Sequence, residues 1–161
     1  MKLPKRKSNR LIGYDYSQYG AYFITICIKD RKKLLWQNVV GATFGRPIET
    51  SLSSIGKIVD TEIAKISDVY KNVTIKKYVI MPNHIHMIIV LQPDEGRRPQ
   101  VAPTISRIIQ QFKGSISKKL GFSIWQKSYY DHIIRNETEY QKIWEYIDTN
   151  PLKWEHDKYY T

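Results

Sequence analysis

The sequence predicts an α+β fold in which helices pack on an antiparallel β-sheet. Short apolar runs rich in β-branched and aromatic residues predict strands, and longer segments with a helical period predict helices. These segments follow one another as strand, helix, strand, strand, helix and a final strand-like segment, which is typical of an α+β domain. The length of 161 residues and the 42% hydrophobic content fit a single core. We therefore expect one domain over residues 1–161.

The first predicted strand covers residues 21–28 and follows a basic segment at residues 1–20. Its β-branched and aromatic side chains suit a buried strand. Residues 29–32 are predicted to form a turn, after which residues 34–40 would pair back as a short strand. Residues 41–50 contain glycine and proline, and we expect a loop there.

The first predicted helix covers residues 53–67. Its apolar side chains recur at the helical period and fall on one face, whereas charged side chains lie on or near the other. Two further strands are predicted, one within residues 69–81 and one over residues 83–91. Residues 92–103 are polar, contain proline and glycine, and are predicted to form a loop. The apolar stripe of the helix consists of Ile55, Ile58, Val59, Ile63 and Ile66.

The second predicted helix covers residues 104–119 and is broken by Gly121. Residues 122–134 mix polar and aromatic side chains and are expected to contain a short strand. A third helix is predicted over residues 137–149, because Asn150 precedes a proline and the residue before a proline avoids the helical conformation. This order of elements indicates a sheet of ferredoxin-like type with its helices on one face.

The charge of the chain indicates an anionic partner. Lysine and arginine outnumber aspartate and glutamate by 26 to 15, which gives a formal net charge of +11. A domain this basic attracts polyanions. The chain also contains 12 tyrosines and 4 tryptophans, and aromatic rings among basic groups suit single-stranded nucleic acid, whose bases stack on them. The alternative is a generically basic surface without such a partner.

The sequence contains no apolar stretch of membrane-spanning length, and no apolar signal region follows the basic N-terminus. We therefore expect a cytoplasmic protein. Its single cysteine, Cys27, lies in the first predicted strand and cannot form an internal disulfide. It is predicted to be a buried strand residue rather than a nucleophile.

Two histidines stand one residue apart in the strand predicted over residues 83–91. Side chains alternate between the faces of a strand, so His84 and His86 point to one face while Ile85 points to the other. Two imidazoles side by side on a rigid sheet provide half of a metal site, which needs a further ligand from elsewhere. The alternative is a pair of polar residues on a solvated face.

On the third predicted helix, Tyr146 lies away from the apolar stripe, and Asn150 follows four positions later on the same side. This spacing suits a tyrosine nucleophile with a metal-binding amide one turn further on. The alternative is a boundary tyrosine followed by an asparagine cap. The apolar stripe itself, which is predicted to face the core, consists of Tyr140, Ile143, Trp144 and Ile147.

In combination, these features resemble the single-tyrosine HUH transposases, in which a His-hydrophobe-His strand is followed by a helix that carries the tyrosine. Residues 125–136, with the sequence WQKSYYDHIIRN, and residues 145–151, with the sequence EYIDTNP, resemble the branch called REP-associated tyrosine transposases. The resemblance covers residues 20–154. It implies a ferredoxin-like HUH endonuclease fold, with one IS200-like transposase domain over residues 1–161 and a C-terminal tail at residues 155–161.

By this resemblance, Tyr146 is the nucleophile, and His84, His86 and Asn150 hold a divalent metal, Mg²⁺ or Mn²⁺. Related insertion-sequence enzymes commonly have the longer glutamine where this chain has Asn150. The resemblance implies cleavage and rejoining of DNA through a 5′-phosphotyrosine intermediate. The partner implied is single-stranded or hairpin DNA, and the protein would be associated with the nucleoid. It would act as a monomer or a homodimer. The alternative within the family is a domesticated hairpin-binding protein without catalytic activity.

Other assignments fit the sequence less well. Tyr129 and Tyr130 lack the helical spacing to an amide and rank below Tyr146. A histidine-triad hydrolase has a third histidine where Ile88 stands. An RNA-recognition-like binding module explains neither the histidine pair nor the tyrosine spacing. Basic side chains that are candidates for holding DNA are Arg97, Arg98, Arg107, Lys113, Lys118 and Lys119, together with Lys5, Arg6 and Lys7.

Overall fold

The computed structural model describes residues 20–37, 52–93 and 103–160. The predicted loop at residues 41–50 lies outside these ranges, as do most of the basic N-terminal segment and the DNA-binding candidates Lys5, Arg6, Lys7, Arg97 and Arg98. In chain order the elements are β1 (Gly20–Cys27), the 3₁₀ helix η1 (Lys29–Arg31), α1 (Ser54–Val69), β2 (Val73–Ile80), β3 (His84–Leu91), α2 (Ile105–Leu120), β4 (Tyr130–Ile134), α3 (Glu137–Thr149) and the 3₁₀ helix η2 (Asn150–His156).

The four strands form one antiparallel sheet in the order β2-β3-β1-β4. The two central strands pair so that Thr25 lies opposite His86, and Cys27 lies opposite His84. With α1 and α2 between them, the strands follow the βαββαβ path of a ferredoxin-like fold, which confirms the predicted fold class. The register also decides which side chains of β1 lie beside the two histidines.

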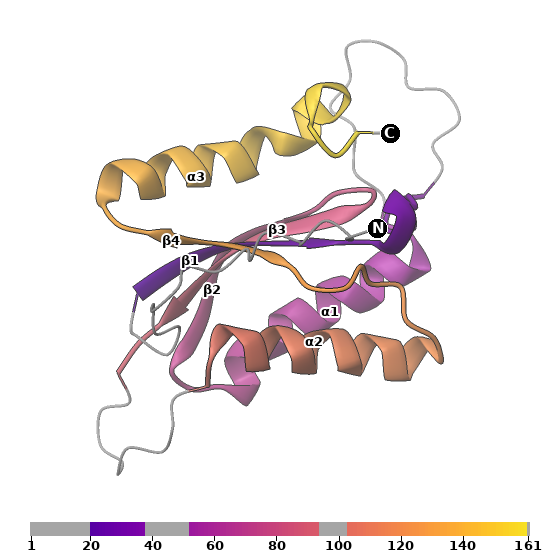
Figure 1. The fold of residues 1–161 in the computed structure, drawn as a ribbon, viewed down its shortest axis with the longest axis horizontal. Helices are drawn as coiled ribbons and strands as arrows, with labels where there is room; N and C mark the ends of the chain where they lie inside the picture. Colours follow the sequence, from indigo (N-terminus) through magenta and orange to yellow (C-terminus); the bar gives the residue numbers. More distant parts are fainter. Residues whose placement is uncertain (1–19, 38–51, 94–102, 161) are drawn as a thin grey trace, which may run out of the picture.

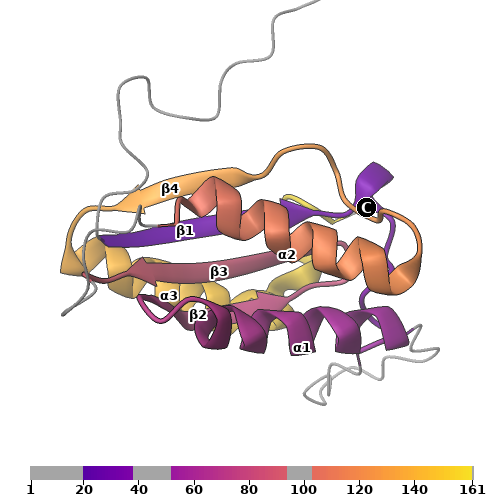
Figure 2. The same ribbon diagram turned by 90° about the horizontal axis from the view of Figure 1, so that it is seen from below.

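The helices cover both faces of the sheet: α1 and α2 lie on one face and α3 on the other (Figures 1 and 2). The expectation of helices on a single face is therefore wrong for α3. The βαββαβ path places its two helices on one face and leaves the other bare, and the chain returns across that bare face after β4. The core beneath α1 and α2 includes Tyr22, Ile24 and Ile26 of β1, Ile85, Met87 and Ile89 of β3, Ile63 of α1 and Phe112 of α2.

Local capping sets the limits of the helices. Asn136 accepts a hydrogen bond from the backbone N–H of Glu139 at 2.8 Å and thereby fixes the start of α3. Gly121 ends α2 in the left-handed conformation, with φ of 81°, at the predicted break. The end of α3 at Thr149 also matches the prediction, but the predicted reason is wrong: Asn150 has helical dihedral angles, with φ of −57° and ψ of −44°, and the chain continues directly into η2. None of the helices within the described ranges has the length and apolar character needed to cross a membrane.

Residues 34–37, the described part of a predicted short strand, form no strand. A single isolated bridge joins Trp36 to Leu52. The segment is held instead by a close approach to α1, where a β-carbon on Gly56 would lie 2.1 Å from the carbonyl oxygen of Leu35. Only glycine allows the two backbones to come this near.

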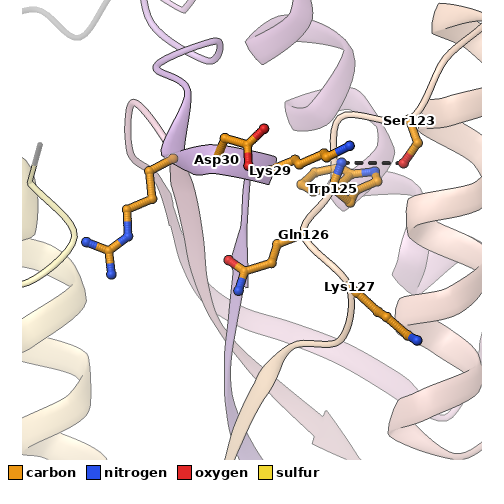
Figure 3. A pocket seen from close by; sticks show the side chains of 7 residues that line it. Lys29, Asp30, Ser123, Trp125, Gln126 and Lys127 are labelled. Carbon is orange, nitrogen blue, oxygen red and sulfur yellow. Dashed lines mark hydrogen bonds between the residues drawn. The ribbon is translucent and has the colours of Figure 1, made fainter. Parts of the chain in front are cut away.

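A polar hollow of about 550 Å³ opens where β1 runs into η1 (Figure 3). Trp125 is buried beside it, and its indole N–H donates to the carbonyl oxygen of Lys113 at 3.3 Å. The backbone N–H of Gln126 donates to the carbonyl oxygen of Cys27 at 2.9 Å, so this part of the segment before β4 is tied to the end of β1. The hollow is lined by Lys29, Asp30, Arg31, Ser123, Trp125, Gln126 and Lys127.

Candidate active site

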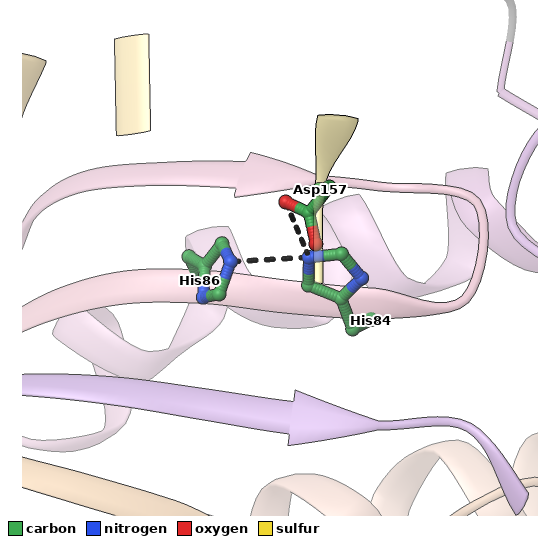
Figure 4. A group of neighbouring side chains, drawn as sticks. All are labelled: His84, His86 and Asp157. Carbon is green, nitrogen blue, oxygen red and sulfur yellow. Dashed lines mark hydrogen bonds and ion pairs between the residues drawn. The ribbon is translucent and has the colours of Figure 1, made fainter. Parts of the chain in front are cut away.

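β3 places both predicted metal ligands on the face of the sheet that α3 covers. The side chains of His84 and His86 are 0% and 1% exposed, which rules out a pair of polar residues on a solvated face. Their Nε2 atoms face each other at 3.0 Å (Figure 4). The alternation that the sequence predicts is thus present, with Ile85 between them in the core on the opposite face.

The other nitrogen of each ring is held by a hydrogen bond. His84 Nδ1 lies 2.8 Å from Asn83 Oδ1, and since a carbonyl oxygen only accepts, the imidazole N–H donates. The Asn83 amide is itself oriented, because its Nδ2 donates to the carbonyl oxygen of Tyr159 at 2.8 Å. His86 Nδ1 forms a 2.8 Å hydrogen bond with Thr25 Oγ1. Partners of this kind fix the rings of metal-binding histidines and leave Nε2 as the ligand atom.

Burial keeps both imidazoles neutral. It lowers the pKa of His84 to about 3, with a smaller contribution from the charge of Lys158. Burial also lowers the pKa of His86 well below its usual value, assisted by His84 and Lys158. Neutral imidazoles have the lone pairs that a metal requires, so at neutral pH neither ligand has to lose a proton first.

Helix α3 places Tyr146, which lies outside its apolar stripe, next to His84 and His86. The hydroxyl of Tyr146 lies 3.3 Å from His86 Nε2, and its ring is 39% exposed. The edge of the ring packs against Phe23 of β1 at 6.1 Å between ring centroids. Burial and the nearby Asp157 carboxylate raise the pKa of Tyr146, while a hydrogen bond from Asn150 opposes the rise. The phenol is therefore protonated at neutral pH and needs help to act as a nucleophile.

Asn150 follows Tyr146 by one turn, as the sequence indicates. Its side chain is 3% exposed, and its Oδ1 makes no hydrogen bond to any other described residue. A buried amide oxygen without a donor is costly unless a cation or a water satisfies it. The donor set of two imidazole nitrogens and one free amide oxygen therefore fits a divalent ion.

Two residues of the C-terminal segment also reach the histidines, which no pattern in the sequence predicts. Asp157 Oδ2 lies 3.9 Å from His84 Nε2, and one ligand atom from each of Asp157, His84 and His86 lies within 4.8 Å of the others (Figure 4). The ring of Tyr159 packs on His84 with 4.4 Å between ring centroids. The sequence predicts only a C-terminal tail at residues 155–161, because these contacts form only after η2 has turned the chain back over the sheet.

Two proteins of Haemophilus influenzae are similar in sequence to this chain. An uncharacterized protein of Haemophilus influenzae is 34% identical over 96% of this chain and 93% of its own length. A second Haemophilus influenzae protein, whose name assigns it provisionally to the REP-associated tyrosine transposases, is 23% identical over 86% of this chain and 74% of its own length. The chain is therefore similar to the REP-associated tyrosine transposases. No protein-family model matches it.

A solved structure of a REP-associated tyrosine transposase, bound to a REP hairpin, has the same fold. It superimposes with a TM-score of 0.63 and 22% identity, covering 98% of this chain and 77% of its own. This similarity agrees with the resemblance of residues 125–136 and 145–151 to REP-associated tyrosine transposases, and the α+β architecture matches that of the solved structure.

Helix α2 does not bring its predicted DNA contacts to the histidines. It lies on the opposite face of the sheet (Figure 1). Lys113 donates from Nζ to the carbonyl oxygens of Gln126 and Ser128, at 3.0 and 2.5 Å. Lys119 pairs with Glu62 of α1. Arg107 and Lys118 are exposed on α2 and remain predicted contacts for DNA away from the site.

Basic side chains near the nucleophile come instead from α3 and the C-terminal segment. A hollow of about 420 Å³ lies beside Tyr146 and Asn150. Three lysines contribute to its lining. No pattern in the sequence indicates them, because a single lysine on a helix or in a terminal segment suggests only an exposed, solvated charge. They are Lys142, Lys153 and Lys158.

Proposed function

We propose that the protein is a metal-dependent endonuclease and transposase that cleaves and rejoins single-stranded DNA at hairpin, REP-like sequences. One observation carries the proposal: the Tyr146 hydroxyl lies 3.3 Å from His86 Nε2, which lies 3.0 Å from His84 Nε2. A tyrosine beside two buried neutral imidazoles has the parts that cleavage through a phosphotyrosine needs. The hairpin bound to the structural relative supports this class of substrate.

His84, His86 and Asn150 would hold the ion through two Nε2 atoms and Oδ1. Two imidazole nitrogens and an amide oxygen leave coordination positions open for phosphate oxygens, and this set of ligands suits Mn²⁺ and Mg²⁺. An ion held by these residues would orient the scissile phosphate and neutralise the charge that develops on it.

Tyr146 would attack the phosphorus with its hydroxyl oxygen. A Tyr146 Oη–P bond forms, the P–O3′ bond of the DNA breaks, and the released 3′ oxygen takes a proton. The phenolic proton passes to solvent, to which the half-exposed ring is open. The DNA stays attached as a 5′-phosphotyrosine, and attack by another 3′-hydroxyl reverses the step and rejoins a strand.

Nucleophile and ligands belong to the same chain, so a single copy supplies a whole site and a monomer suffices. Lys142, Lys153 and Lys158 around the hollow beside Tyr146 would bind the phosphates that flank the scissile one. A protein that acts on chromosomal hairpins would work in the cytoplasm, at the nucleoid.

Incubation of the purified protein with labelled single-stranded hairpin DNA tests the proposal. With Mn²⁺ we expect a covalent protein–DNA adduct on a denaturing gel, and its loss in Tyr146→Phe. Tyr140→Phe, on the same helix, is the matched control and should retain the adduct. Tight hairpin binding by the wild type without any adduct would contradict the enzymatic proposal and identify a hairpin-binding protein.

A further inference from the structure

Asp157 is held in a fixed position over the histidines. Its backbone N–H donates to the carbonyl oxygen of Trp154 at 3.0 Å, and its Oδ1 accepts from the backbone N–H of Tyr159 at 2.7 Å. The carbonyl oxygen of Tyr159 accepts from Asn83, the same residue that orients His84. These bonds leave Oδ2 directed at His84 Nε2, with the side chain only 3% exposed (Figure 4).

The Asp157 carboxylate faces the imidazole of His84 rather than the side chain of a lysine or arginine. His84 donates from Nδ1 to Asn83, so in its neutral form it presents a lone pair at Nε2. Asp157 Oδ2 and His84 Nε2 are then two acceptors that face each other at 3.9 Å. In the described part of the chain, no lysine or arginine forms an ion pair with Asp157. A buried carboxylate in this position is costly unless a cation lies between it and the imidazoles.

We propose that Asp157 is a further ligand of the divalent cation when no DNA is bound, and that an oxygen of the scissile phosphate replaces it. The inference rests on the proposed function, because it concerns the same ion. Two imidazoles and one carboxylate are a common ligand set for divalent first-row metals such as Mn²⁺. The three ligand atoms already lie within 4.8 Å of one another, so a small movement of Oδ2 completes the set.

The exchange of ligands is balanced and requires no other reactant. The carboxylate of Asp157 would leave the ion as a phosphate oxygen binds it, so one negatively charged oxygen ligand would replace another. The carboxylate belongs to the last described turn of the chain, beside the hollow that Tyr146 and Asn150 line. In the resting protein, Asp157 therefore occupies the coordination position that the substrate phosphate needs. It leaves that position, and the ion stays bound, when the phosphate arrives.

Mn²⁺ titration of the full chain without DNA, followed by electron paramagnetic resonance of the free ion, tests the proposal. Asp157→Asn removes the charge, and we expect Mn²⁺ to bind at least about tenfold more weakly. Asp157→Glu retains the carboxylate and should bind more tightly than Asp157→Asn. Glu155→Gln, an exposed residue of the same segment, should bind as the wild type does. Unchanged affinity in folded Asp157→Asn would overturn the proposal.

Two further measurements distinguish a failure of this inference from a failure of the proposed function. Mn²⁺ affinity that is unchanged in His86→Ala would contradict the metal site itself, and Asp157 with it. At saturating Mn²⁺ and hairpin DNA, Asp157→Asn should form at least as much adduct as the wild type, because the phosphate takes the vacated position. A loss of adduct in Asp157→Asn under those conditions would overturn the exchange. The Mn²⁺ titration does not depend on cleavage, so it remains informative if no adduct forms.

Discussion

The two faces of the sheet differ in what their side chains do, although the same strands supply both. On the face beneath α1 and α2, alternate residues of β1 and β3 are aliphatic and fully buried, as Ile24 and Met87 are. On the face beneath α3, three of the intervening residues are polar and equally buried, namely Thr25, His84 and His86. Burial therefore serves stability on one face, and on the other it keeps two imidazoles neutral and oriented.

The largest effect on stability is expected at Ile24, which is completely buried among α1, α2 and the sheet. Ile24→Ala should lower the free energy of unfolding by about 2–5 kcal/mol, because it leaves a cavity that the core fills only in part. Denaturant unfolding followed by circular dichroism measures this. The affinity of the folded fraction for Mn²⁺ should stay unchanged, and a loss of affinity would show that the two faces are not separable.

Substitution of the adjacent residue, Thr25, is expected to change the affinity for Mn²⁺ rather than the stability. Thr25→Val preserves the shape of the side chain but removes the hydrogen bond to His86 Nδ1. Mn²⁺ affinity should fall about 10–100-fold, as it does when an outer partner of a metal-binding histidine is lost. Isothermal titration calorimetry measures the change, with Thr74→Val on β2 as the control. Equal affinities in both variants would mean that Thr25 does not orient the ring.

A third prediction concerns the ionic cluster between α1 and α2. Burial alone would raise the pKa of Glu62, but hydrogen bonds from Lys119, Ser115 and Lys65 lower it to about 2. A lowered carboxyl pKa adds stability above the unfolded value of about 4.5, and this stability is lost as the pH falls towards 2. Glu62→Gln should therefore cost about 1–2 kcal/mol at pH 7 and progressively less below pH 4.5.

Thermal unfolding of Glu62→Gln and the wild type between pH 7 and pH 2.5 checks this dependence. The two melting temperatures should converge as the pH falls. A constant difference across the range would show that the charge of Glu62 is not the source of the stability.

The smallest effect is expected where α3 meets the edge strand β2. Lys77 forms a 2.6 Å ion pair with Asp148, whose side chain is largely exposed, and its ammonium lies 4.8 Å from the ring centroid of Trp144. Exposed pairs contribute little, so Lys77→Ala should cost less than about 1 kcal/mol. Salt should shrink the difference in denaturant unfolding further. A cost above that of Ile24→Ala would mean that α3, rather than the opposite face, dominates stability.

The sequence predicted the elements of both faces but not how the second face is assembled. Periodicity gives the limits of α3 and sets Tyr146 apart from its apolar stripe, and strand alternation places His84 and His86 together. Periodicity does not say which face of the sheet a helix covers, which is why α3 was expected beside α1 and α2.

The partners of the histidines were missed for a different reason. Thr25 meets His86 only through the register of β1 with β3, and Asp157 meets His84 only after the chain folds back. Asn83, which directly precedes His84, was the one partner that lay within reach of a local pattern. Contacts between distant segments leave no spacing in a single sequence from which to infer them.

Mapping the covalent adduct tests the central claim most directly. The protein is incubated with single-stranded hairpin DNA and Mn²⁺, digested with protease and nuclease, and the nucleotide-bearing peptide is identified by mass spectrometry. The account predicts a 5′-phosphotyrosine at Tyr146, dependent on metal and absent in His86→Ala. An adduct on another tyrosine, such as Tyr130, or one that forms equally without metal, would contradict it.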